Sequence, residues 1–167
     1  LVSETGILKA NSGPGYADIT GDYCINASGS PDRLTQLYYA EEPITITGFK
    51  IRVQGDRQNA YFQGGVWLDN AGVPEQLKGS LKTSETVGVT NWTWMTLTFD
   101  TPVQIASDTY FHVGIQKGNG GFYVAHYPAP LEGWHVTYGD VSTPSIDRRV
   151  SFAMDLLGKC ESAVVTS

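Results

Sequence analysis

The stretch NWTWMTLTFDTPVQIASDTYFHVGIQ, residues 91–116, decides the fold. It contains two runs in which every second residue is apolar, separated by turn-forming Asp, Pro and Ser residues. The apolar positions are Met95, Leu97 and Phe99 in the first run and Phe111, Val113 and Ile115 in the second. Successive side chains of a β-strand point to opposite faces, so this pattern buries one face only. It therefore predicts β-strands that each cover a core with one side.

Similar alternation recurs at residues 44–54, 60–68 and 149–157. Residues 34–40, LTQLYYA, predict a further strand, rich in aromatic residues. No segment shows the periodicity of a sustained helix, and 167 residues suit one domain with a substantial core. We predict an all-β fold, a jelly-roll-type β-sandwich of about nine to eleven strands. Residues 1–167 would form this single domain, with 1–30 as a loosely patterned N-terminal arm.

Three interruptions of the alternation carry further predictions. Gly48 lies inside the run at 44–54 and predicts a β-bulge or a bend there. Residues 117–121, KGNGG, predict a hairpin turn whose return strand is 122–127. Residues 128–148 contain several prolines and no alternation, so we expect a long irregular loop. Binding groups often lie in loops of this kind.

The charge balance limits the partners that the protein can have. The net charge is −6, and no segment supplies the basic patch that nucleic acid or an acidic membrane surface would require. No apolar run approaches the length of a transmembrane helix. We therefore expect neither nucleic-acid binding nor membrane insertion.

Two cysteines, Cys24 and Cys160, lie near opposite ends of the chain. A disulfide between them would tie the N-terminal segment to the last strand and would suit a secreted protein. In the chain-entropy model such a link contributes on the order of 4 kcal/mol. The alternative is a pair of buried free thiols. We favour the disulfide because chain termini most need a tether.

The order of motifs in the central part of the chain resembles a known class of modules. The motifs are Tyr38-Tyr39-Ala40, Ile44 to Phe49, a strand ending at Trp67, the loop 69–74, Trp94 to Phe99, and Asp108 to Val113. They are similar to those of the non-catalytic, carbohydrate-binding-module-like β-sandwich domains of secreted bacterial surface and glycoside-degrading proteins. Modules of tailed-phage fibres are similar too. The resemblance implies carbohydrate or cell-surface binding in an extracellular location.

Two tryptophans in the opening stretch are the first candidate ligand site. Trp92 and Trp94 are two residues apart and share the strand face opposite the apolar positions. Two neighbouring indoles form a flat platform on which the C–H face of a sugar ring can stack. Alternatively, Trp94 closes the rim of the sandwich, or both lie under the 128–148 loop. Asn26 and Asn91 begin glycosylation sequons, and a glycan on Asn91 would crowd the platform.

The irregular 128–148 loop is the second candidate site. Its aromatic and hydrogen-bonding groups suit a ligand pocket, and two tyrosines of the preceding segment could join them. These candidates are Trp134, His135 and Tyr138 in the loop, with Tyr123 and Tyr127 before it. The same groups would equally serve to pin the loop to the sheet.

The sequence contains no motif that indicates catalysis. It has no nucleophile elbow, phosphate-binding loop or His-Glu metal motif, so we expect no enzyme activity and no cofactor. A pair of carboxylates acting on a glycosidic bond would leave no such signature. For a structural Ca²⁺ the best oxygen clusters are Asp69-Asn70 and the pair Asp18 and Asp22. Turn formation explains both clusters as well.

Two hypotheses of function follow. The first is a secreted glycan-binding module that recognises a carbohydrate or cell-surface glycan through exposed Trp and Tyr side chains. The second is a structural or assembly subunit, of a viral fibre or an extracellular filament. In the second, the arm at 1–30 would pack against other copies of the chain or a larger parent protein.

Overall fold

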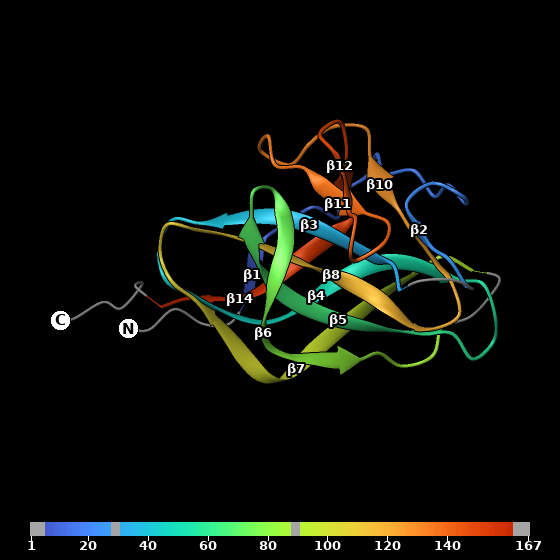
Figure 1. Ribbon diagram of the computed structural model, residues 1–167, viewed down its shortest axis with the longest axis horizontal. Coiled ribbons are helices and arrows are strands. Elements are labelled where there is room, and N and C mark those ends of the chain that lie inside the picture. The colour runs from blue at the N-terminus through green and yellow to red at the C-terminus, as the bar shows by residue number, and fades with distance from the viewer. Residues whose placement is uncertain (1–5, 28–30, 88–90, 162–167) are drawn as a thin grey trace.

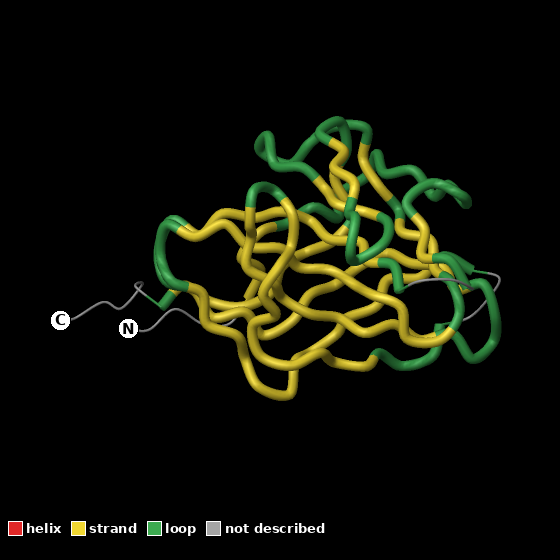
Figure 2. Tube along the Cα trace, in the orientation of Figure 1, coloured by secondary structure: helices red, strands yellow, loops and turns green. Residues whose placement is uncertain are grey.

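The computed structural model of the protein describes residues 6–27, 31–87 and 91–161 (Figure 1). Within these ranges every regular element is a β-strand, and all paired strands run antiparallel (Figure 2). The same ranges contain no helix long and apolar enough to cross a membrane. The predicted all-β fold is confirmed.

Most strands belong to two six-stranded sheets. The first sheet contains β1 (Gly6–Lys9), β14 (Met154–Cys160), β4 (Ile44–Gly55), β9 (Phe122–Val124) and β2 (Cys24–Ile25) in that order, with β7 (Thr93–Ile105) also paired to β4. The second sheet has the order β12 (Ser145–Asp147), β11 (Val136–Tyr138), β3 (Arg33–Ala40), β8 (Thr109–Asn119), β5 (Tyr61–Asn70) and β6 (Val73–Thr83). A separate pair consists of β10 (His126–Tyr127) and β13 (Ser151–Phe152).

The two large sheets enclose one hydrophobic core. The alternating residues Leu97 and Phe99 of β7 and Phe111, Val113 and Ile115 of β8 are all buried in it, as predicted. The sheets touch through aromatic side chains, for example where the rings of Phe62 and Phe122 meet at 5.5 Å. Since each buried side chain of this size contributes roughly 1.5–3 kcal/mol, this shared core holds the sheets together.

The strand pattern differs from the prediction in number and length. The described residues form fourteen strands rather than nine to eleven, because six strands have only two or three residues. The run at 93–105 is one strand. In its pairing with β4 the register shifts, so that the four residues 99–102 lie opposite a single β4 residue, Thr47. This register shift lies beside Gly48 and confirms the predicted bulge.

The segment after β8 does not form the predicted hairpin. β9 pairs with β4 and β2 in the opposite sheet rather than with β8. The predicted loop at 128–148 is also partly regular, because β11 and β12 lie inside it and extend the second sheet beyond β3. In Figure 1 these short strands gather at one side of the molecule, next to β3.

The described part of the N-terminal segment, residues 6–27, packs on its own domain. β1 pairs with the edge of β14, and β2 pairs with β9. Between them, the Ala17 N–H donates to the carbonyl of His126 at 2.8 Å. The segment therefore follows the first sheet and continues it at two places.

The predicted disulfide is wrong, because Cys24 and Cys160 are both free thiols. Cys160 of β14 pairs with Ile44 at the start of β4. Cys24 of β2 pairs with Tyr123 of β9, and Tyr123 in turn pairs with Gln54 near the end of β4. Ten strand residues correspond to roughly 33 Å, because a strand rises about 3.3 Å per residue. A disulfide requires Cα atoms within about 7 Å.

Candidate functional site

A pocket of about 350 Å³ lies between the two sheets, where β3 and β1 end. Its apolar walls are Leu8, Tyr38, Ile44, Phe111, Trp134 and Leu156. Its polar lining includes Lys9, Glu41, Glu42 and Glu132. We refer to this cavity as the Trp134 pocket. Its volume is within the range of small-ligand sites, roughly 300–1,000 Å³, and its lining combines aromatic faces with charged groups as such sites do.

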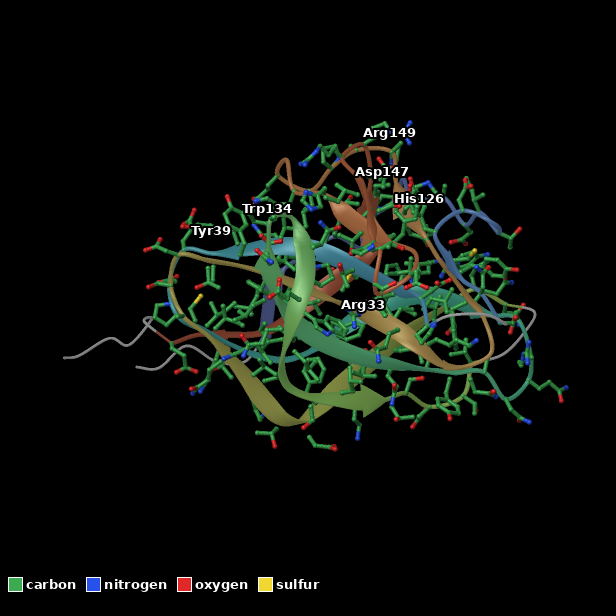
Figure 3. All side chains as sticks on the ribbon, viewed as in Figure 1. Arg33, Tyr39, His126, Trp134, Asp147 and Arg149 are labelled. Atoms are coloured by element: carbon green, nitrogen blue, oxygen red, sulfur yellow. The ribbon has the colours of Figure 1, made fainter. Side chains whose placement is uncertain are left out.

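A tight turn positions Trp134 at this pocket. The Trp134 N–H donates to the carbonyl of Leu131 at 2.8 Å, and the two central residues, Glu132 and Gly133, have φ of 51° and 82°. Such left-handed residues are typical of a type I′ turn and explain the glycine. The indole then packs edge-on against the ring of Tyr38, with 6.3 Å between centroids. Figure 3 shows Trp134 close to Tyr39, at the end of β3.

An ion pair lies across the indole. Lys9 Nζ is 5.5 Å from the centroid of the Trp134 ring and 2.8 Å from Glu132 Oε1. The side chains of Lys9 and Glu132 are 32% and 53% exposed. An exposed pair of this kind contributes only about 0–1 kcal/mol to stability. The charged groups over Trp134 can therefore rearrange at little cost.

Tyr38 forms the floor of the pocket. Its ring stacks on Phe111 with 5.6 Å between centroids, and only 1% of the residue is exposed. The hydroxyl has no hydrogen-bond partner among the described residues. Burial raises the pKa of Tyr38 well above its usual value, so the phenol is neutral. A buried hydroxyl without a partner is unfavourable. Because this oxygen is closed to solvent, Tyr38 contributes its ring rather than its hydroxyl to the pocket.

The remaining polar lining is acidic. Glu41 and Glu42 are exposed at the end of β3, and Glu42 forms a hydrogen bond with the thiol of Cys160. Burial and this bond raise the pKa of Cys160. The thiol is therefore a poor nucleophile, because the reactive form of cysteine is the thiolate. The pocket thus offers hydrogen-bond acceptors and aromatic surface rather than a reactive group.

The structure places Trp94 in a second aromatic cluster, on the outer face of the first sheet. Lys50 Nζ lies 4.9 Å and Arg52 Cζ 5.9 Å from the centroid of its ring. Tyr16, from the N-terminal segment, packs edge-on at 5.7 Å. Arg52 also forms a two-pronged ion pair with Asp18. The Trp94 ring is therefore surrounded by protein groups.

The other predicted stacking residues lie apart from the Trp134 pocket. Trp92 is half-buried just before β7, and no ring contact joins it to Trp94 in the part of the chain described. Tyr127 packs on Tyr16, 6.0 Å away, and so belongs with Trp94. Tyr123 is half-buried on β9. Of the seven candidates, the structure brings only Trp134 to this pocket.

Trp94 also borders a larger cleft of about 690 Å³ between β6 and β7. The cleft is lined mainly by hydroxyl and charged side chains, such as those of Thr83, Ser84 and Thr96. Its second aromatic residue, Phe62, is fully buried. The cleft therefore offers less stacking surface than the Trp134 pocket.

Tyr138 lines a separate polar pocket of about 550 Å³. Its ring lies 5.7 Å from that of Tyr23, whose hydroxyl donates to Asp147. Arg149 holds the same carboxylate with Nη2 3.0 Å from Oδ2, and this contact lowers the pKa of Asp147. Figure 3 shows Asp147 and Arg149 well away from Trp134. The polar groups at the wall of this pocket largely bond to one another.

His135 is buried rather than available to a ligand. Its Nε2 donates to the carbonyl of Gly72 at 2.6 Å, and its Nδ1 accepts from Arg148 at 3.3 Å. Gly72 lies at the tip of the β5–β6 hairpin, which reaches across the second sheet. His135 therefore holds this hairpin against the segment before β11. For His135, this is the structural alternative to ligand binding that the sequence left open.

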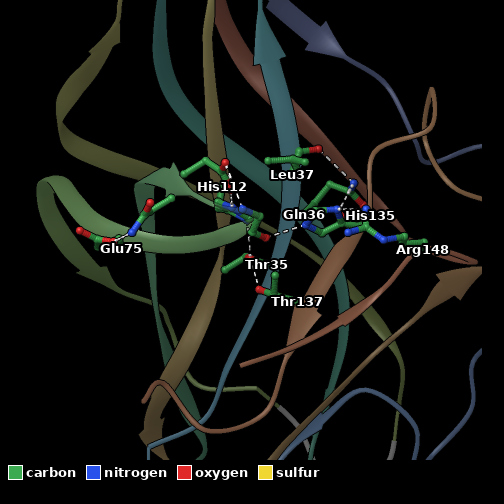
Figure 4. Close-up of polar contacts among 11 residues, drawn as sticks. Thr35, Gln36, Leu37, Glu75, His112, His135, Thr137 and Arg148 are labelled. Atoms are coloured by element: carbon green, nitrogen blue, oxygen red, sulfur yellow. Dashed lines mark hydrogen bonds and ion pairs between the residues drawn. The ribbon is translucent and has the colours of Figure 1, made fainter. Parts of the chain in front are cut away.

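A buried polar chain near His135 has the residue types of a catalytic triad. His112 Nε2 donates to Asp69 Oδ1 at 2.7 Å, and His112 Nδ1 accepts from Thr35 Oγ1 at 3.0 Å (Figure 4). Thr35 Oγ1 in turn bonds to the hydroxyl of Thr137. Both Thr35 and His112 have no exposed surface. A nucleophile must reach its substrate, so this arrangement serves stability rather than acyl transfer.

Two of the four candidate calcium ligands, Asp18 and Asp69, are engaged by protein groups. The carboxylate of Asp18 faces Arg52, and that of Asp69 accepts from His112 and from the Gly72 N–H. In the described ranges, no group of three or more His, Cys, Asp or Glu side chains is placed to hold a metal ion.

Sequence reasoning missed Lys9, Tyr38 and Glu132, which complete the Trp134 pocket. The Glu132-Gly133 pair was the one local signal, because it forms the turn that positions the indole of Trp134.

Comparisons with protein families, with curated proteins and with solved structures found no match to this chain.

Proposed function

We propose that the protein is a secreted, non-catalytic glycan-binding domain that holds a sugar ring in the Trp134 pocket. The observation that carries this proposal is a half-buried indole beside a cavity of about 350 Å³ with an aromatic floor and carboxylates in its lining. The C–H face of a pyranose would stack on the indole. The carboxylates of Glu41 and Glu132 would accept hydrogen bonds from sugar hydroxyls.

Trp134 is a better candidate than Trp94 because of what surrounds each ring. Trp94 has two cationic groups over it and the edge of Tyr16 against it, and one of those cations, Arg52, is held in place by Asp18. Among the described residues, the charged groups at Trp134 are those of the exposed Lys9–Glu132 pair. A sugar can displace such a pair more easily than it can dismantle the cluster at Trp94.

We further propose that the two sheets form a jelly roll. The support is the strand order: β1, β14, β4 and β7 are neighbours in one sheet, and β3, β8, β5 and β6 in the other. Along the chain these strands pass repeatedly from one sheet to the other, as two Greek keys require. Lectin domains are among the proteins built this way.

The alternative is a structural subunit of a fibre or filament. The packing of residues 6–27 on their own domain leaves this part of the arm committed to β14, β9 and His126. Assembly would then have to use other surfaces, such as the edge strands β6 and β7, each of which pairs on one side only. We favour glycan binding for this reason.

A glycan array with the purified chain tests the proposal. We expect binding that Trp134→Ala abolishes and that Trp94→Ala leaves within about twofold. Trp134→Phe serves as a second variant that keeps the packing against Tyr38. Light scattering of the same sample reports the oligomeric state. An oligomer that binds no glycan would support the assembly alternative instead.

A further inference from the structure

An ammonium group already occupies the open face of Trp134. Lys9 Nζ lies 5.5 Å from the centroid of the indole while pairing with Glu132 at 2.8 Å. Indole is the side chain that attracts cations most strongly through its face. The geometry at Lys9 therefore demonstrates that this position accepts a protonated amine between an aromatic face and a carboxylate.

The rest of the pocket favours a cation as well. Among the described residues that line it, three carboxylates, those of Glu41, Glu42 and Glu132, face one positive charge, that of Lys9. A ligand with a negative charge would be repelled, whereas a positive group would be attracted. The floor supplies a further aromatic ring, that of Tyr38, which packs against Trp134.

Lys9 can leave this position without disrupting the core. Its side chain is 32% exposed, and it lies on a four-residue edge strand, β1. Its bond to Glu132 is a surface ion pair, which a ligand ammonium can replace with an equivalent one. A neutral sugar could offer hydroxyls to Glu132 but could not restore its charge partner.

We propose that the Trp134 pocket selects an amino sugar with a free, protonated amine, and that Lys9 marks the ammonium position. This inference rests on the proposed glycan-binding function and names the ligand class. The sugar ring stacks on Trp134, and its ammonium group replaces Lys9 Nζ beside Glu132. No covalent step is involved.

Titration calorimetry with three linear tetrasaccharides tests the proposal. Tetramers of glucosamine, N-acetylglucosamine and glucose are compared at about pH 6, where an amine of this type is protonated. We expect the glucosamine tetramer to bind about tenfold more tightly than the other two. Equal binding of all three, or tighter binding of the acetylated tetramer, would overturn the amine selectivity while leaving glycan binding intact.

Two variants examine the ammonium position directly. Lys9→Gln removes the competing ammonium and should raise the affinity for the glucosamine tetramer about threefold, and Glu132→Gln should lower it about fivefold. The matched controls are Lys82→Gln and Asp100→Asn, which alter an equivalent exposed ion pair of 2.7 Å on β6 and β7. Neither control should change the affinity.

The outcomes separate the two proposals. If no tetramer binds but the glycan array shows other ligands, the amino-sugar selectivity is wrong, and if the array is blank as well, glycan binding itself is wrong. If the tetramers bind but Lys9→Gln weakens the glucosamine tetramer, Lys9 contributes to binding rather than competing with it, and the ammonium position is wrong. Thermal unfolding of each variant shows whether β1 remains docked.

Discussion

His112 Nε2 lies 2.7 Å from Asp69 Oδ1, yet the imidazole is neutral at physiological pH. Burial lowers the pKa of His112 to about 4, although the hydrogen bond to Asp69 acts in the opposite direction. The ring has no exposed surface, so water cannot stabilise its charged form. Desolvation therefore outweighs the attraction of a single carboxylate.

Stability should fall as the pH is lowered from about 6.5 to about 4. In this window an unfolded His112 binds a proton and the native one does not, so protons favour the unfolded chain. The effect is up to about 3 kcal/mol, and His126, whose pKa burial also lowers, acts in the same direction. Urea unfolding followed by Trp fluorescence at several pH values measures it.

His112→Gln provides the comparison for this titration. The variant should be less stable at pH 7 but should lose much of the decline between about pH 6.5 and 4. Asp147 does not contribute in this window, because its pKa is lowered from 3.8 and its effect falls at more acidic pH. Wild-type stability that is flat across the window would contradict the assignment.

Gly114→Ala should be severely destabilising. A Cβ atom at this position would lie 1.9 Å from the carbonyl oxygen of Leu34 on the neighbouring strand. Neither backbone can yield without breaking the β3–β8 pairing, so we expect a loss of more than about 3 kcal/mol. Gly13→Ala is the matched control, because a Cβ there meets nothing within 4 Å. Denaturant midpoints of the two variants should differ accordingly.

Tyr38→Phe should stabilise the protein. The substitution removes a buried hydroxyl that has no hydrogen-bond partner among the described residues, and keeps the stacking on Phe111. A gain of about 1 kcal/mol is expected. Tyr23→Phe should have the opposite effect, since its hydroxyl bonds to Asp147. Thermal unfolding of both variants measures these changes in stability. A Tyr38→Phe variant less stable than the wild type would show that the Tyr38 hydroxyl does form a hydrogen bond, against this prediction.

Reduction should not affect stability. Cys24 on β2 and Cys160 on β14 are free thiols that lie near opposite ends of β4. They are therefore too far apart for an intramolecular disulfide in the native state. The melting temperature should be the same with and without dithiothreitol. Alkylation of the denatured, unreduced protein should add two labels, as mass spectrometry would show. A shift of several degrees on reduction would contradict the register of β2 and β14.

The fold was predictable where strands are long. The alternation in β4, β7 and β8 encodes which side chains face the core, because the period of a strand is two. β10 and β13 carry too few residues for any period, and only their pairing partner defines them. Pairing between distant segments, such as Ala17 with His126, leaves no local pattern either.

The site was less predictable because it is assembled from distant segments. Trp134 stood out as an aromatic residue in a loop, but Tyr38 looked like an ordinary core residue of β3. Lys9 comes from a segment without alternation and reaches the pocket only through the pairing of β1 with β14. The distinction between Trp94 and Trp134 depends on neighbours such as Lys50, which no sequence period reveals.

The place of β14 has a consequence for how the chain folds. This last strand lies between β1, the first, and β4, so the first sheet cannot close until residues 154–160 have left the ribosome. Nascent chains that stop short of them would expose one side of β4 and be prone to aggregate. Folding should consequently be slow, because β1 and β4 must both find a strand more than 90 residues away along the chain.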